Sequence, residues 1–188
     1  MALSHAILVS LLDRPQAGYD LAKLFDKTVG QFWRASHQQI YGELHKLAAK
    51  NFVEAETIEQ SDRPNKIVYS LTDDGRKALD DWMAAPTTPP SIKEDLIVKL
   101  FSSGRVEAAV LLDNLRQRQQ LARERLAEWE AVRDEFYPDT TKLTPRQTGR
   151  YLGLQSGITS ELRFLDWCDE AISLLTPIAE KESQAAKA

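Results

Sequence analysis

Residues 34–46 gather side chains that can hydrogen-bond to nucleic acid. Glutamine can bond to N6 and N7 of adenine at once, and both Gln38 and Gln39 lie in this stretch. Arginine, histidine, tyrosine and lysine suit contacts to phosphates or to the edge of a groove. The candidates are Arg34, Ser36, His37, Gln38, Gln39, Tyr41 and Lys46. The alternative interpretation of the same residues is a solvated helix face that binds nothing.

A second basic group lies between two runs rich in β-forming residues, 52–58 and 66–71. The intervening Ser-Asp-Arg-Pro-Asn favours a tight turn, so the two runs predict a β-hairpin. Arg63, Asn65 and Lys66 would lie at its tip, where a hairpin can meet the backbone or the minor groove of DNA. This second group favours DNA binding over a merely solvated face.

Catalytic and metal chemistry find little support in the sequence. The three histidines, His5, His37 and His45, form neither a His-x₃-His pair nor a triad-like set. The glycines are isolated rather than grouped into a phosphate-binding loop. The acidic pairs at 73–74 and 80–81 are typical of a helix N-terminus and a solvated helix face. We therefore expect no enzyme activity, no metal site and no cofactor.

The composition is typical of a globular protein, and its positive charge is concentrated in one part of the sequence. With 43% hydrophobic residues among 188, the chain can bury at least one sizeable core. A net charge of -4 argues against coating nucleic acid indiscriminately, which needs many lysine and arginine contacts to phosphates. Residues 34–50 depart from this acidic balance, since they contain Arg34, Lys46 and Lys50 but only one acid, Glu43.

Nothing in the sequence indicates export or a membrane span. No uninterrupted apolar run approaches the roughly 20 residues that cross a bilayer, and no basic segment precedes an apolar one at the N-terminus. The single cysteine, Cys168, suits a reducing compartment and a buried side chain. We expect a cytoplasmic protein.

The first 85 residues predict three helices, the hairpin and a fourth helix. Ser36 and Gln39 form a capping box that starts the third helix, and apolar residues every three to four positions give it an inward face. Thr72 should cap the fourth helix. Few other small folds share this order of elements, so we expect a winged helix-turn-helix DNA-binding domain at residues 1–85.

Three prolines in residues 86–90 predict an extended linker. The remaining residues, 91–188, predict a second domain made only of helices, with dimerisation and effector binding as its candidate roles. The expected fold class is therefore mainly α with a small β-hairpin wing. It combines an N-terminal winged helix-turn-helix with a C-terminal, coiled-coil-like helical domain.

Three helices are expected in the second domain. A capping box at Ser91 and Glu94 should start a short helix, and a long helix should follow from residue 105 to about 137. A last helix should begin at Thr144, because a cap, a proline at the first helical position and a glutamine agree there. Pro177 should kink or end that helix.

The long helix carries apolar residues at alternating spacings of four and three, as the seam of a coiled coil does. At about 1.5 Å per residue it would be roughly 50 Å long, more than a small domain can cover. We therefore expect a homodimer in which a second subunit covers part of the helix. The candidate interface residues are Leu112, Leu115, Leu126, Ile158, Leu162 and Leu165.

The chain resembles the PadR-like transcriptional regulators in several motifs. Gly-Tyr-Asp-Leu at 18–21 opens the second helix, Ile-Tyr at 40–41 lies in the third, and Tyr-Ser-Leu-Thr at 69–72 leaves the wing. Asn51 stands where family members often have glycine, and asparagine can adopt the same left-handed cap. The resemblance implies binding of the third helix to a palindromic operator in double-stranded DNA, and we include Tyr19 among the contacts.

The helical half is similar to the larger PadR subgroup, in which some members respond to phenolic acids such as hydroxycinnamates or vanillate. Aromatic residues in this half could line a pocket for such an acid, with an arginine pairing its carboxylate. The effector-binding candidates are Trp129, Tyr151, Arg150, Arg163, Trp167 and Phe101. The simpler interpretation is that aromatic residues at helical spacing form a core.

Two functions from different classes follow from the sequence. The first is a homodimeric repressor that binds DNA and is released by a phenolic acid. The alternative is a winged-helix adaptor that binds protein partners rather than DNA. Specific binding to promoter DNA that weakens steeply with salt would separate them.

Overall fold

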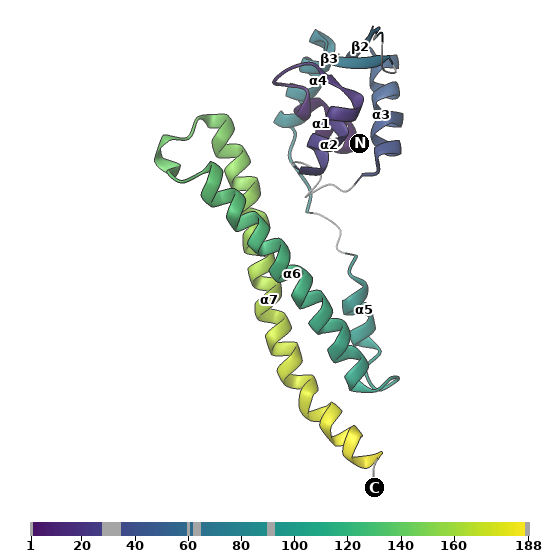
Figure 1. The fold of residues 1–188 in the computed structure, drawn as a ribbon, viewed down its shortest axis with the longest axis vertical. Coiled ribbons are helices and arrows are strands. Elements are labelled where there is room, and N and C mark those ends of the chain that lie inside the picture. The colour runs from purple at the N-terminus through teal and green to yellow at the C-terminus, as the bar shows by residue number, and fades with distance from the viewer. Residues whose placement is uncertain (1, 28–34, 60, 62–64, 90–92, 187–188) are drawn as a thin grey trace. The chain divides into compact units, whose positions relative to one another are not determined.

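The computed structural model describes residues 2–27, 35–59, 61, 65–89 and 93–186. The chain divides into two compact units, Met1–Pro90 and Ser91–Ala188, which are drawn in Figure 1 and are described separately below. Arg34 and Arg63, two of the expected DNA contacts, lie outside the described residues.

The N-terminal unit packs its helices around one hydrophobic core. The helices are α1 (Ala2–Ser10), α2 (Gly18–Lys27), α3 (His37–Ala49) and α4 (Asp73–Ala84). Each contributes fully buried side chains, such as Ile7 from α1, Phe25 from α2, Leu44 from α3 and Leu79 from α4. This core holds α3 by its inner face, because Ile40, Leu44 and Leu47 are all buried.

A three-stranded antiparallel sheet completes the unit. The expected hairpin is confirmed as β2 (Val53–Ile58) and β3 (Lys66–Leu71), with Val53 opposite Leu71 and Ile58 opposite Lys66. A third strand, β1 (Gln16–Ala17), pairs with the other edge of β3, so that the order is β1-β3-β2. The sequence did not predict β1, because two residues are too few to show an alternating pattern.

The predicted caps of the N-terminal unit are confirmed. The Thr72 hydroxyl accepts a hydrogen bond from the Gly75 amide at 3.0 Å and donates one to the Asn51 carbonyl at 2.6 Å. Asn51 has a φ of 58°, the left-handed conformation expected of the residue that ends α3. These bonds fix the path of the chain from α3 into the hairpin and from the hairpin into α4.

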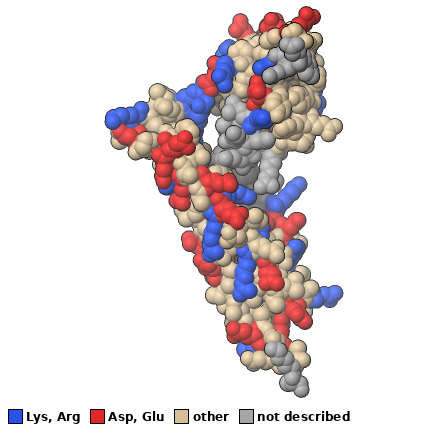
Figure 2. Space-filling model, viewed as in Figure 1, with Lys and Arg blue, Asp and Glu red and all other residues tan. Residues whose placement is uncertain are grey.

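The C-terminal unit is a long helical hairpin with a short helix beside it (Figure 1). Its elements are α5 (Asp95–Phe101), α6 (Ala108–Phe136), a 3₁₀ turn η2 (Thr140–Lys142) and α7 (Pro145–Ala185). On the face of the hairpin that Figure 2 shows, acidic and basic side chains are interspersed.

Two details of this unit correct the expectations. Glu94 itself caps α5 by accepting a hydrogen bond from the Leu96 amide, while Ser91, its expected partner in a capping box, lies outside the described residues. Of the two effects expected of Pro177, it does not end α7, which continues to Ala185, and a kink stays a prediction. In the described part of the chain, no helix is both long and apolar enough to cross a bilayer.

Candidate nucleic-acid interface

The first turn of α3 presents polar side chains outward. His37, Gln38 and Gln39 are exposed, whereas Ile40 on the next position is fully buried. The capping box is formed as predicted: the Gln39 amide donates to Ser36 Oγ at 3.2 Å, and the Ser36 amide donates to Gln39 Oε1 at 2.8 Å. Because Gln39 is engaged in capping, Gln38 is the better candidate for reading a base.

Tyr41 is held where α2, α3 and β3 meet. A Cβ atom on Gly18 would lie 2.6 Å from Tyr41 Cε1, so the ring fills the space that glycine leaves. The same Cβ would lie 3.4 Å from the ring of Tyr69 on β3, which is buried. Burial raises the pKa of Tyr69, with a smaller contribution from Tyr41. The half-buried Tyr41 therefore links the start of α2 to α3.

Two expected phosphate contacts have acidic partners within the same unit. Lys46 Nζ lies 3.1 Å from Glu43 Oε2, and Lys66 Nζ lies 3.2 Å from Asp20 Oδ2. Asn65 is exposed beside Lys66 at the start of β3. Exposed ion pairs contribute little to stability, so both lysines can exchange these partners for a phosphate.

Tyr19 is exposed on α2, and its ring is covered by a lysine that the sequence reasoning missed. Lys23 Nζ lies 4.5 Å from the centroid of the Tyr19 ring. Hydrogen bonding to the Tyr19 side chain raises the pKa of Lys23, and Asp20 adds a smaller attraction. The four-residue spacing of Tyr19 and Lys23 on one helix was the signal that could have revealed this contact.

The six effector-binding candidates do not lie together at one site in the structure. Trp129 is only 6% exposed and packs with Leu154 and Ile158, while Tyr151 lies beside Tyr137. Trp167 belongs to a second cluster around Leu96, Leu115 and Cys168. Phe101 is 89% exposed, and Arg150 and Arg163 are also exposed.

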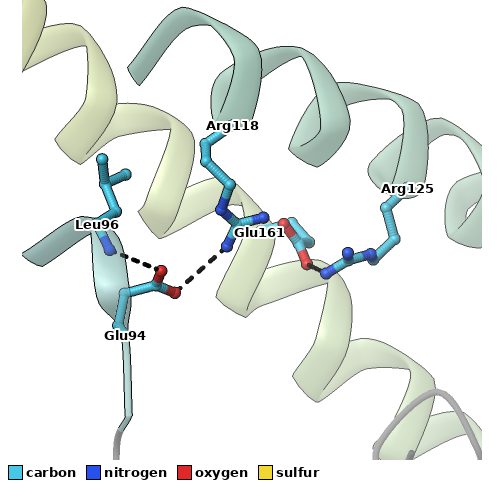
Figure 3. Close-up of polar contacts among 5 residues, drawn as sticks. All are labelled: Glu94, Leu96, Arg118, Arg125 and Glu161. Atoms are coloured by element: carbon cyan, nitrogen blue, oxygen red, sulfur yellow. Dashed lines mark hydrogen bonds and ion pairs between the residues drawn. The ribbon is translucent and has the colours of Figure 1, made fainter. Parts of the chain in front are cut away.

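Polar contacts tie the three helices of the C-terminal unit together (Figure 3). Arg118 on α6 lies 3.3 Å from Glu94 at the start of α5, and its guanidinium lies over the Phe164 ring of α7. Arg125 on α6 donates to Glu161 on α7 at 2.7 Å. Both contacts join segments that are distant in the sequence, so they fix how α5 and α7 lie along α6.

An open pocket of about 220 Å³ lies between α5 and α6. Lys99 and Arg118 supply two cationic groups to its wall, and Leu96 and Leu121 supply apolar surface. The remaining lining residues are Glu94, Asp95, Asn114 and Gln117, so none of the six sequence candidates is among them.

The candidate dimer residues divide into inner and outer groups. Leu112, Leu115 and Ile158 are buried within one chain, because α6 packs along α7 of the same subunit. Leu126 and Leu165 are half-buried, and Leu162 is 44% exposed. The sequence does not predict this burial, because it depends on α7, which has 41 residues, packing along α6 of the same chain.

Comparisons with known proteins decide the family. The probable transcriptional regulator Rv1176c of Mycobacterium tuberculosis is 36% identical over 93% of this chain and 98% of its own length. The chain belongs to the PadR-like family. Residues 7–81 match the family model described as the transcriptional regulator PadR-like family, and residues 92–176 match the one described as virulence activator alpha C-term.

This PadR-like protein has relatives of known structure. The negative transcriptional regulator PadR of Bacillus subtilis is 30% identical over 92% of this chain and 97% of its own length. Its structure with operator DNA has a TM-score of 0.81, 26% identity, and coverage of 93% of this chain and 99% of its own. Its structure with p-coumaric acid has a TM-score of 0.76, 25% identity, and coverage of 94% and 99%. The family and these relatives are transcriptional regulators and not enzymes.

Proposed function

We propose that this PadR-like regulator is a homodimeric repressor that binds a palindromic operator through α3 and is released by a small aromatic acid. The observation that carries DNA binding is the first turn of α3. A capping box fixes its backbone, the core holds its inner face, and His37 and Gln38 are exposed. The structural match to a relative in complex with operator DNA supports the same use of the unit.

DNA binding is tested by fluorescence anisotropy on the DNA upstream of the protein's own gene and of its neighbours. Gln38→Ala should cost about 1–3 kcal/mol on the specific site and relax the preference at one base pair. Gln120→Ala, on the exposed surface of α6, is the matched control and should change nothing. If the wild-type protein binds none of these promoters with a steep salt dependence, the protein-binding adaptor becomes the better interpretation.

The proposed dimer uses the outer surface of α6 and α7. Val110, Leu121 and Val132 are exposed and recur every 11 residues, which is about three helical turns, so they lie along one side of α6, here called the apolar stripe. This side of the helix is the surface that a second subunit would cover. A dimer would place two α3 helices about 34–36 Å apart, which is the distance between successive major grooves on one side of the DNA.

Light scattering tests this surface. Leu121→Glu should convert the dimer to a monomer, because it places a charge at the middle of the stripe. Val98→Glu, on the exposed side of α5, is the control and should leave the dimer intact. A Leu121→Glu protein that remains a tight dimer would place the interface elsewhere.

The effector proposal rests on a relative's complex with p-coumaric acid and on the chemistry of the α5–α6 pocket. Lys99 can pair with a carboxylate, Arg118 can do so in exchange for its partner Glu94, and Leu96 and Leu121 can contact a ring. At about 220 Å³ the pocket is smaller than the roughly 300–1,000 Å³ of typical ligand sites, which favours a single-ring acid. Release of DNA by 100-fold would require about 2.7 kcal/mol of coupling between effector and DNA.

Titration of vanillate, ferulate, p-coumarate and benzoate against the DNA complex tests the effector. We expect at least one of them to quench tryptophan fluorescence and release DNA, and Lys99→Ala to raise the concentration required. Lys142→Ala, which removes an exposed lysine from η2, is the control for loss of charge. If no acid acts at millimolar concentration, the aromatic effector is refuted while DNA binding stands.

A further inference from the structure

Asp20 pairs with a lysine from another element, and a second lysine follows it on its own helix. Its carboxylate is 3.2 Å from Lys66 Nζ, where β3 begins, and Lys23 lies three positions further along α2, a spacing that places the two side chains on one side of the helix. Asp20 and Lys66 are 46 positions apart in the sequence, so the fold and not the local sequence brings them together. One lysine thus contacts the carboxylate, and a second lies on the same side of α2.

Tyr19 holds the second of these lysines in place. Lys23 Nζ lies over the Tyr19 ring at 4.5 Å from its centroid, a distance at which a ring attracts an ammonium group. Lysine side chains are otherwise mobile, and positioning one in advance reduces the entropy lost on binding. Lys23 is thereby prepared to contact an anion near Asp20.

The cluster adjoins α3. Gly18, which precedes Tyr19, approaches Tyr41 of α3 and Tyr69 of β3 so closely that a Cβ atom would lie 2.6 and 3.4 Å from their rings. The start of α2 and the middle of β3, three residues along the strand from Lys66, therefore lie next to the proposed recognition helix. A DNA strand whose groove holds α3 would bring its phosphates to elements flanking that helix.

We propose that Lys23 and Lys66 form a binding site for one DNA phosphate, and that Asp20 occupies this site when DNA is absent. The inference rests on the proposed DNA binding of this unit. A carboxylate and a phosphate offer the same kind of anionic oxygen acceptor to an ammonium group. Asp20 is thus an intramolecular competitor, which keeps affinity for DNA below what the two lysines would give.

The test is binding of the full chain to a 24-base-pair duplex of random sequence, measured by fluorescence anisotropy between 0.05 and 0.3 M KCl. Removal of the competitor by Asp20→Asn should tighten binding by about two- to fivefold, because the lysines no longer have to give up an exposed ion pair before they contact the phosphate. The salt slope should stay close to the wild-type value, because the number of phosphates contacted is the same.

Asp80→Asn is the matched control, since it changes the net charge equally on an exposed position of α4, an element that packs on α1. It should change affinity less than twofold, because it leaves the ion pair between Asp20 and Lys66 intact. Thermal unfolding should show that both variants fold, since both aspartates are exposed.

Removal of the lysines completes the test. Lys23→Gln and Lys66→Ala should each weaken binding to all sequences and lower the salt slope by about one unit. In the Lys23→Gln/Lys66→Ala background, Asp20→Asn should have an effect below twofold. The phosphate site is refuted if Asp20→Asn does not tighten binding, or if it tightens binding equally without the lysines. Failure of the wild-type protein to bind any duplex would instead refute the proposed function and the site together.

Discussion

Gly18 allows α2 and α3 to approach closely, and Gly18→Ala should disturb Tyr41 specifically. The added Cβ would lie 2.6 Å from Tyr41 Cε1, whereas ordinary contact begins at 3.4 Å, so the ring must move by the difference, 0.8 Å. The backbone of Tyr41 cannot follow, because its neighbours Ile40 and Leu44 are fully buried. The ring must therefore rotate toward solvent.

The energetic cost follows from two opposing effects. Overpacking costs about 1–3 kcal/mol, while replacing glycine by alanine stabilises the protein by about 0.4–1 kcal/mol, because it reduces the conformational entropy of the unfolded chain. We expect a net loss of about 1–2 kcal/mol in the free energy of unfolding, measured by thermal denaturation. Gly149→Ala is the control, because a Cβ there meets nothing within 4 Å and should stabilise α7. The moved ring should also weaken specific DNA binding more than binding to random duplex.

A double-mutant cycle identifies Tyr41 as the cause. In a Tyr41→Ala background the clash is absent, so Gly18→Ala should become neutral or slightly stabilising. If Gly18→Ala is equally destabilising with and without the Tyr41 ring, the close approach of the two helices is not what glycine provides.

Three further predictions concern the helical hairpin. Gly157→Ala should destabilise it by about 1–3 kcal/mol, because the new Cβ would lie 2.2 Å from the Trp129 ring, and tryptophan fluorescence should change. Glu161→Ala should cost about 1–3 kcal/mol in urea denaturation by removing the partner of the half-buried Arg125, and less in an Arg125→Ala background. Burial raises the pKa of Cys168, so its thiol should react with a disulfide reagent at pH 8 far more slowly in the native protein than in urea.

The parts of the fold that depend on local sequence could be predicted. The Ser36–Gln39 capping box, the Thr72 cap and the left-handed Asn51 were each recognised because their partners lie within a few residues. The outward face of α3 followed from the same periodicity that buries Ile40. These signals were sufficient to give the order of elements in the winged unit.

Contacts between distant residues could not be predicted in the same way. Nothing local to Asp20 indicates that the fold brings Lys66 to it, and nothing local to Gln16–Ala17 indicates a strand until β3 is present to pair with it. The burial of Leu112 and Leu115 by α7 of the same chain depends on how the helical hairpin closes, which no local pattern in α6 indicates. Trp129 and Trp167 pack in two different clusters, and which cluster each joins also depends on how α6 and α7 pack together.

The pairing of lysines in the winged unit bears on how such a regulator could discriminate among DNA sites. Lys46 has Glu43 as its partner and Lys66 has Asp20, so each contact to a phosphate requires the loss of an intramolecular ion pair. If these lysines contact phosphates, the exchange lowers the affinity for operator and for other DNA alike, because both kinds of complex contain phosphate contacts. The ratio of the two affinities, which is the specificity, then depends on the base contacts of α3. In a chain with a net charge of -4, the paired lysines would therefore limit binding to all DNA and leave discrimination to α3.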